Sequence, residues 1–166
     1  MKKKYVAYTD GACLPNPGMG SWAYVITENN KIINQNSGFV ANTTSNRMEM
    51  FAVIEVLKQF KDVTIYSDSD LTVKTINIWM KNWEKNNWKK KNKKEVKNLD
   101  LVKQLNKFFD NKNHEIFWVK GHNGTEGNEL VDEMCKDELI KNMGIELYKK
   151  LSTPKIVLVK KEIREE

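Results

Sequence analysis

The chain uses one pattern twice, an apolar and β-branched run that ends in an acid: Tyr5-Val6-Ala7-Tyr8-Thr9-Asp10 and Val63-Thr64-Ile65-Tyr66-Ser67-Asp68. Runs of this length and composition are typical of buried strands. A carboxylate in such a place is costly unless it is paired or binds a metal ion. The acid that ends each run, Asp10 or Asp68, is therefore a candidate functional residue.

Two further acids share one side of a predicted helix with apolar residues. Glu49 has Val53 and Val56 at positions i+4 and i+7, and Asp132 lies at the edge of a stripe that contains Cys135. We expect all four acids to face the core, with no comparable set of buried bases to neutralise them. Carboxylate oxygens are hard ligands suited to Mg²⁺ or Mn²⁺, so this set predicts a divalent cation site.

The composition is that of one ordinary globular domain. The chain has 166 residues, of which 40% are hydrophobic and 30% charged, enough to bury a proper core. Its two cysteines, Cys13 and Cys135, have no zinc-site spacing and predict a reducing compartment. The polar Tyr8-Thr9-Asp10 interrupts any apolar signal segment after Met1. We expect a cytoplasmic monomer with no membrane partner.

The net charge of +6 lies entirely in one short segment. Residues 81–97 carry eight lysines and two glutamates, and the rest of the chain has 20 basic and 20 acidic residues. A concentrated basic patch is typical of polyanion binding. The lysines expected to contact a nucleic acid are Lys85, Lys89, Lys90, Lys91, Lys93 and Lys94.

Three tryptophans lie in or next to this basic segment. Trp79 fits a core position and a surface position equally well. Trp83 and Trp88 are flanked by lysines, so for them we expect a surface that grips a backbone or stacks on bases.

The periodicity predicts a mixed five-stranded sheet with helices on both faces, a three-layer α/β fold. We expect this domain to span residues 1–143 and residues 144–166 to be a frayed tail rather than a docked strand. The expected strands are 4–12, 20–28, 31–40, 63–68 and 114–119, and the expected helices are 44–60, 70–81, 99–110 and one that ends near 143.

This topology brings the acids together. If the strands at 4–12 and 63–68 are parallel neighbours, Asp10 and Asp68 lie side by side. A right-handed crossover places the first turn of the 44–60 helix, with Glu49, at the same edge, and Asp132 closes the cluster from the last helix. Such a cluster can hold two cations for phosphoryl displacement. Acids beside a basic, aromatic strip indicate a nuclease.

Five motifs, in order over residues 3–143, resemble the ribonuclease H type 1 family, in the cellular branch that has a basic protrusion. The implied fold is the three-layer ribonuclease H fold. The matching segments are Tyr8-Thr9-Asp10-Gly11-Ala12-Cys13 with Asn16-Pro17-Gly18, Asn46-Arg47-Met48-Glu49, Ser67-Asp68-Ser69, Trp118-Val119-Lys120-Gly121-His122, and Asn128-Glu129 with Asp132.

The resemblance implies an endoribonuclease that hydrolyses the RNA strand of an RNA–DNA hybrid and leaves 5′-phosphate and 3′-hydroxyl ends. The four acids are then ligands of two Mg²⁺ ions, with Mn²⁺ as a substitute. His122 is then an assisting proton carrier, since histidine titrates near neutrality. The alternative is a non-catalytic hybrid-binding module of the same fold, which would have no use for four buried acids. A transposase or integrase of this fold would usually need additional DNA-binding domains.

The resemblance also implies contacts with the hybrid. Asn42 stands where many members have a phosphate-binding arginine, and Asp70 stands where an amide is common, so both departures bear on affinity. An acid at Asp70 repels phosphates and donates no hydrogen bond. Thr44 and Asn98 remain as the rest of the phosphate pocket. The other expected contacts near the cluster are Cys13, Asn16, Ser45 and Asn46.

Overall fold

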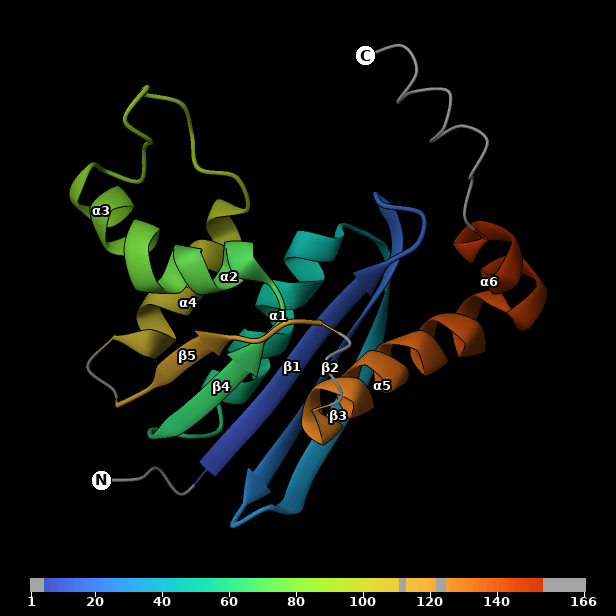
Figure 1. The fold of residues 1–166 in the computed structure, drawn as a ribbon. Coiled ribbons are helices and arrows are strands. Elements are labelled where there is room, and N and C mark those ends of the chain that lie inside the picture. The colour runs from blue at the N-terminus through green and yellow to red at the C-terminus, as the bar shows by residue number, and fades with distance from the viewer. Residues whose placement is uncertain (1–4, 111–112, 122–124, 154–166) are drawn as a thin grey trace.

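The computed structural model describes residues 5–110, 113–121 and 125–153, which form a five-stranded mixed sheet flanked by helices (Figure 1). The strand order is β3-β2-β1-β4-β5; β1 pairs antiparallel with β2, as β2 does with β3, and β1-β4 and β4-β5 are parallel. The predicted sheet is confirmed. The strands are β1 Tyr5–Cys13, β2 Gly18–Glu28, β3 Lys31–Thr43, β4 Val63–Ser67 and β5 Glu115–Trp118.

Helices cover both faces of the sheet, so the three-layer prediction is also confirmed. The larger core joins the sheet to α1 and α4, and the smaller one joins it to α5 through Val25 and Val131. The helices are α1 Ser45–Leu57, α2 Asp70–Lys74, the π-helical η1 Thr75–Trp79, α3 Met80–Lys85, α4 Leu99–Phe109, α5 Glu126–Met143 and α6 Ile145–Ser152.

The helix expected over residues 70–81 differs from the prediction in its middle. A π-helical turn, η1, separates α2 from α3, and the helical stretch continues to Lys85. Val73, Ile76 and Met80 are all buried on one side of this stretch. Apolar residues at these positions suit an α-helix equally well, so the wider turn leaves no mark in the hydrophobic pattern.

The expectation of a frayed tail is wrong for its first part, because residues 145–152 form α6. Gly144 has a φ of 89° and ends α5, and glycine adopts this backbone conformation without the penalty of a side chain. No residue of α6 is buried. The apolar run 156–159 lies outside the described residues. Within the described ranges, no helix is both long and apolar enough to cross a bilayer.

Candidate active site

Strand pairing brings the first two acids to one edge of the sheet. β1 and β4 are parallel neighbours, and Thr9 lies opposite Ser67 in their register. Asp10 and Asp68 directly follow these two residues, so they meet where the parallel pairing of β1 and β4 ends, at its carboxyl end. Ligand sites of open α/β sheets lie at such ends. The predicted pairing of these two acids is confirmed.

A close approach of α1 to β1 adds Glu49. A Cβ atom on Gly11 would overlap the backbone of Met48 and Glu49, so only glycine permits this crossing. Thr44 caps the helix by accepting a hydrogen bond from the Arg47 backbone nitrogen at 3.2 Å. Glu49 lies just beyond the first turn of α1, in which it was expected, and this crossing places it beside Asp10.

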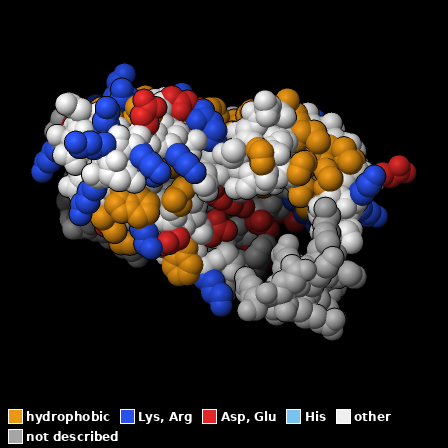
Figure 2. Space-filling model, turned by 90° about the horizontal axis from the view of Figure 1, so that it is seen from above, with side chains coloured by type: hydrophobic (Ala, Val, Ile, Leu, Met, Phe, Trp, Pro, Cys, Tyr) orange, Lys and Arg blue, Asp and Glu red, His pale blue; other side chains and the backbone are white. Residues whose placement is uncertain are grey.

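Three acids form a compact group at this edge, which we call the acid cluster: Asp10, Glu49 and Asp68. Each offers a carboxylate oxygen, and these oxygens all lie within 4.8 Å of one another. Figure 2 shows acidic side chains in a central hollow, with basic side chains gathered over the lobe at left. The arrangement concentrates negative charge beside a basic surface.

Asp132 lies outside the acid cluster but acts on it electrostatically. Its charge contributes to the raised pKa of Asp10. The expectation that all four acids are buried is wrong, because only Asp10 and Glu49 are buried, at 5% and 8% exposure. Asp68 follows the end of its strand and Asp132 lies at the edge of the α5 stripe, so both are half-buried.

Burial and mutual repulsion favour the protonated forms of the two buried acids. Burial, followed by the charge of Asp68, raises the pKa of Asp10 to about 8. Burial and the charges of Asp10 and Asp68 likewise raise the pKa of Glu49. Among the described residues, Glu49 Oε2 has no hydrogen-bond partner. A buried carboxylate oxygen without a donor, beside two further carboxylates, fits a hard divalent cation.

Asp70 is separate from the acid cluster. It is exposed in the first turn of α2 and forms an ion pair with Lys74 at 2.9 Å. The carboxylate is favoured there by the helix dipole. Of these two neighbouring acids, only Asp68 belongs to the acid cluster.

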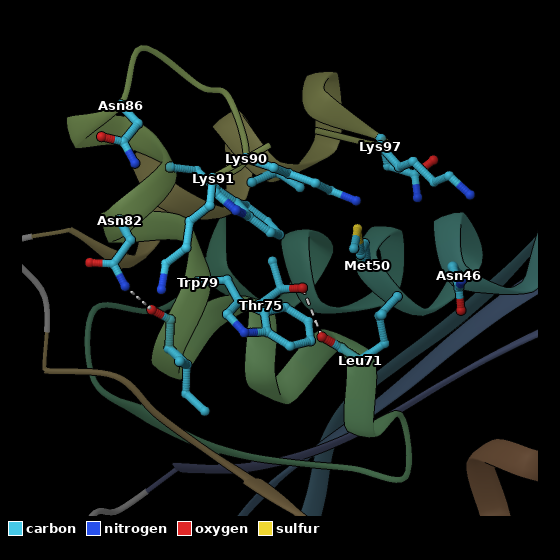
Figure 3. Close-up of a pocket in the computed structure, with 14 residues that line it drawn as sticks. Asn46, Met50, Leu71, Thr75, Trp79, Asn82, Asn86, Lys90, Lys91 and Lys97 are labelled. Atoms are coloured by element: carbon cyan, nitrogen blue, oxygen red, sulfur yellow. Dashed lines mark hydrogen bonds between the residues drawn. The ribbon is translucent and has the colours of Figure 1, made fainter. Parts of the chain in front are cut away.

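A groove of about 730 Å³ lies between α1, the α2–α3 stretch and the basic segment (Figure 3). Trp79 and Trp83 meet in it with ring centroids 5.8 Å apart. Its polar and basic lining includes Lys90, Lys91 and Lys97. A basic groove with aromatic walls suits a nucleic-acid strand.

The groove contains some of the predicted contact residues and omits others. Trp88 packs against the core, with Lys103 Nζ 5.8 Å from its ring centroid, and Trp83 also packs on the core while lining the groove. Trp79, for which core and surface were equally expected, lines the groove. The predicted residues in the lining are Asn46, Trp79, Trp83, Lys90, Lys91 and Asn98; Lys85, Lys89, Lys93 and Lys94 are exposed outside it.

Sequence reasoning missed several lining residues. Thr75, Ile78, Asn82 and Asn86 succeed one another at helical spacings of three or four residues. That spacing, which also includes Trp79, would have identified the side of the helix that faces the groove. Lys97 was counted in the basic segment but not assigned to the site.

The contact residues near the start of α1 are held together by hydrogen bonds. Asn16 Nδ2 donates to Ser45 Oγ at 2.8 Å, and the Ser45 backbone nitrogen donates to Asn16 Oδ1 at 3.2 Å. The Cys13 thiol donates to the Thr43 carbonyl at 3.4 Å. These bonds fix the β1–β2 turn against α1. His122 lies outside the described residues.

Comparison with known proteins identifies the family. The model of the RNase H family matches residues 2–140. The chain belongs to the RNase H family. The ribonuclease H of Francisella philomiragia subsp. philomiragia is 42% identical over 146 residues, which cover 86% of this chain and 95% of that protein. The ribonuclease H of Francisella tularensis subsp. novicida matches with the same identity and coverage.

Solved structures share the RNase H fold. The PFV RNase H domain superposes with a TM-score of 0.74 at 24% identity, over 83% of this chain and 95% of that one. LC11-RNase H1, solved in complex with an RNA/DNA hybrid, gives a TM-score of 0.64 at 20% identity, over 84% of this chain and 99% of that one. At these identities the likeness concerns the fold alone.

Proposed function

We propose that this RNase H family member is a metal-dependent endoribonuclease that cleaves the RNA strand of RNA–DNA hybrids by in-line attack of water. The products carry 5′-phosphate and 3′-hydroxyl ends. The observation that carries the proposal is the acid cluster beside the basic groove, in a chain whose relatives are ribonucleases H. The acid cluster accounts for the hydrolysis, and the groove accounts for binding of the nucleic acid.

Asp10, Glu49 and Asp68 hold a divalent cation in this proposal, with Asp132 at the side of the site. Mg²⁺ or Mn²⁺ held there, as two ions during turnover, would supply activation of the attacking water and neutralisation of charge on the reacting phosphate. The chain supplies preorganised carboxylates, two of them buried. His122 carries a proton during turnover, a role that rests on the sequence alone.

The groove binds the DNA strand, and the start of α1 meets the RNA strand. Lysines that line the groove neutralise phosphates, and the rings of Trp79 and Trp83, which also line it, contact the strand. Asn16, Ser45 and Asn46 provide hydroxyl and amide groups beside the acid cluster. Such groups can recognise the 2′-hydroxyl that distinguishes RNA from DNA.

A hybrid-binding module without catalysis is the weaker alternative. Such a module gains nothing from Glu49, whose buried oxygen lacks a donor among the described residues. This uncompensated cost is explained by a cation that the carboxylates bind. We further propose that the protein acts as a monomer in the cytoplasm, since one chain supplies both the acids and the groove. Its two cysteines are free thiols, which suits a reducing compartment.

Strand-specific labelling tests the proposed reaction. A hybrid labelled at the 5′ end or at the 3′ end of either strand is incubated with the protein and Mg²⁺. We expect internal cuts in the RNA strand alone, and downstream fragments whose 5′ ends ligate without prior phosphorylation. Cuts in the DNA strand, or downstream fragments that need a kinase before ligation, would contradict the proposal.

A further inference from the structure

Arg47 connects the starts of two helices beside the groove. Its guanidinium binds both carboxylate oxygens of Asp100, with Nη1–Oδ1 at 2.9 Å and Nη2–Oδ2 at 2.7 Å. Asp100 lies in the first turn of α4, so the pair joins that helix to α1. The hydrogen bond from Arg47 lowers the pKa of Asp100. A two-bond geometry of this kind fixes the plane of the guanidinium.

The same guanidinium holds the side chain of Asn98. Arg47 Nη1 donates to Asn98 Oδ1 at 3.4 Å, and Asn98 lines the groove. Because the donor occupies the amide oxygen, the NH₂ end of the amide is directed away from Arg47. Asn98 has a φ of 57° and caps α4 without using its side chain, and asparagine tolerates this backbone conformation better than most residues. Within the part of the chain that the structure describes, no acceptor binds its amide NH₂, which can therefore donate to a ligand.

Thr44 is also bonded to Arg47, through the backbone of Arg47 and not through its side chain. The Arg47 backbone nitrogen donates to Thr44 Oγ1 at 3.2 Å. That bond uses the hydroxyl oxygen as acceptor and leaves the hydroxyl hydrogen for another acceptor. This cap bond belongs to the backbone, so it does not depend on the Arg47 guanidinium or on Asp100.

We infer that Arg47, held by Asp100, is a positioning residue that orients the Asn98 amide as a donor toward a backbone phosphate of the strand in the groove. The inference rests on the proposed function for the identity of the ligand. It adds a role for Asp100: this acid beside a polyanion groove improves binding because, through Arg47, it orients the neutral amide donor of Asn98. Without Asp100, nothing in this contact fixes the plane of the Arg47 guanidinium, and the guanidinium in turn no longer holds the Asn98 amide in one orientation.

The direction in which KM changes when Asp100 is neutralised tests this role. Removing an acid near a polyanion site strengthens binding when only long-range electrostatics act. We expect the opposite for Asp100→Asn: a rise in KM of about three- to tenfold, the effect of one lost hydrogen bond, with kcat unchanged. The matched control is Asp110→Asn, at the other end of α4, where the exposed acid pairs with Lys81 at 3.2 Å. The control should leave KM unchanged or lower it.

Equal KM changes in the two variants would overturn the orienting role. Asp100→Glu retains the carboxylate and should recover most of the lost affinity. If Asp100→Asn fails to fold by circular dichroism, Arg47→Lys replaces it, since lysine keeps the charge but cannot make the two-bond contact. An unchanged KM in Arg47→Lys would also overturn the inference.

A scan of the DNA strand with single neutral methylphosphonate linkages identifies the phosphate. Affinity is measured by fluorescence anisotropy with a chelator present, so that binding is read even if cleavage fails. The wild-type protein should lose affinity at one linkage, and Asp100→Asn should lose less at that same linkage. Equal losses in both proteins at every linkage would contradict the inference. Absence of cleavage by the wild-type protein in Mg²⁺ would instead refute the proposed function.

Discussion

Gly11 lies so close to the start of α1 that a Cβ atom on it would overlap the backbone nitrogen of Glu49. This contact sets the separation between strand β1 and helix α1 at the acid cluster. Asp10 directly precedes Gly11 on the strand, and the Gly11 backbone nitrogen donates to its Oδ1 at 2.9 Å. One glycine thus controls how near two of the acids can come.

Gly11→Ala should therefore impair both folding and the site. The added methyl meets backbone rather than a flexible side chain, so we expect a loss of about 1–3 kcal/mol in the free energy of unfolding, as for overpacked cores. Urea unfolding and Mg²⁺-dependent cleavage measure the two effects. Gly144→Ala is the control: its φ of 89° is strained for alanine, so stability falls there too, but cleavage per folded molecule should persist. Full activity of Gly11→Ala would contradict this account of the packing.

Asp10→Asn should stabilise the metal-free protein at alkaline pH. The folded-state pKa of about 8 lies above the ordinary value of 3.8, so the folded state holds a proton that the unfolded state has lost. Stability from this acid is complete below pH 4 and is lost as pH rises to about 8. The variant should therefore gain about 1–3 kcal/mol at pH 8 and little at pH 4.

Urea unfolding in chelator at several pH values measures this gain. Asp137→Asn, which changes an exposed acid of α5, should leave the pH profile unchanged. A variant that is less stable than wild type at pH 8 would show that Asp10 is not strained by burial.

Asp68→Asn and Asp70→Gln should differ sharply although the residues are two apart. Asp68 belongs to the acid cluster, and Asp70 forms an exposed pair with Lys74. We expect Asp68→Asn to abolish cleavage at any Mg²⁺ concentration while largely preserving hybrid binding. Asp70→Gln should cleave normally and bind the hybrid as well or better, since a repelling charge is removed. The reverse pattern would mean that the site has been assigned to the wrong acid.

Lysines that line the groove should contribute more to hybrid binding than equally charged neighbours. Replacing Lys90, Lys91 and Lys97 with glutamine should raise KM and reduce the salt dependence of binding, with turnover at saturation nearly unchanged. The physical reason is that each lysine that neutralises a phosphate releases a counterion from the nucleic acid, which makes binding depend on salt. The matched triple removes the same charge outside the groove, at Lys85, Lys89 and Lys94. Identical salt slopes for the two triples would indicate diffuse attraction instead of a bound strand.

Ending the chain at Met143 should leave hybrid cleavage nearly intact. α6 buries no residue of its own, and the acid cluster and groove lie entirely before it. Cleavage rates and the unfolding midpoint of the shortened chain measure the effect. A large loss of either would show that residues 144–166 pack on the catalytic domain.

The sheet and the position of Asp10, Glu49 and Asp68 were predictable because strand and helix periodicities are strong local signals. Register then follows from topology, since parallel neighbours bring Asp10 and Asp68 to one edge. Local signals say less about exposure at element ends. Asp68 and Asp132 were expected inside the core, yet both are half-buried.

The groove was harder to predict, because its shape depends on packing between distant segments. The sequence favoured Trp88 as a stacking surface, but that ring packs against the core. The π-helical turn η1 leaves the hydrophobic pattern intact, so no local rule revealed it. The role of Lys97 depends on α4 and α1 lying side by side, which a charge count cannot show.

The most direct test of the central claim compares three duplexes under two metal conditions. Labelled RNA–DNA hybrid, duplex RNA and duplex DNA are each incubated with the protein in Mg²⁺ and in a chelator. The account predicts cutting of the hybrid alone, in its RNA strand, and only with Mg²⁺. Cutting of the hybrid in the chelator, or equal cutting of all three duplexes in Mg²⁺, would contradict it.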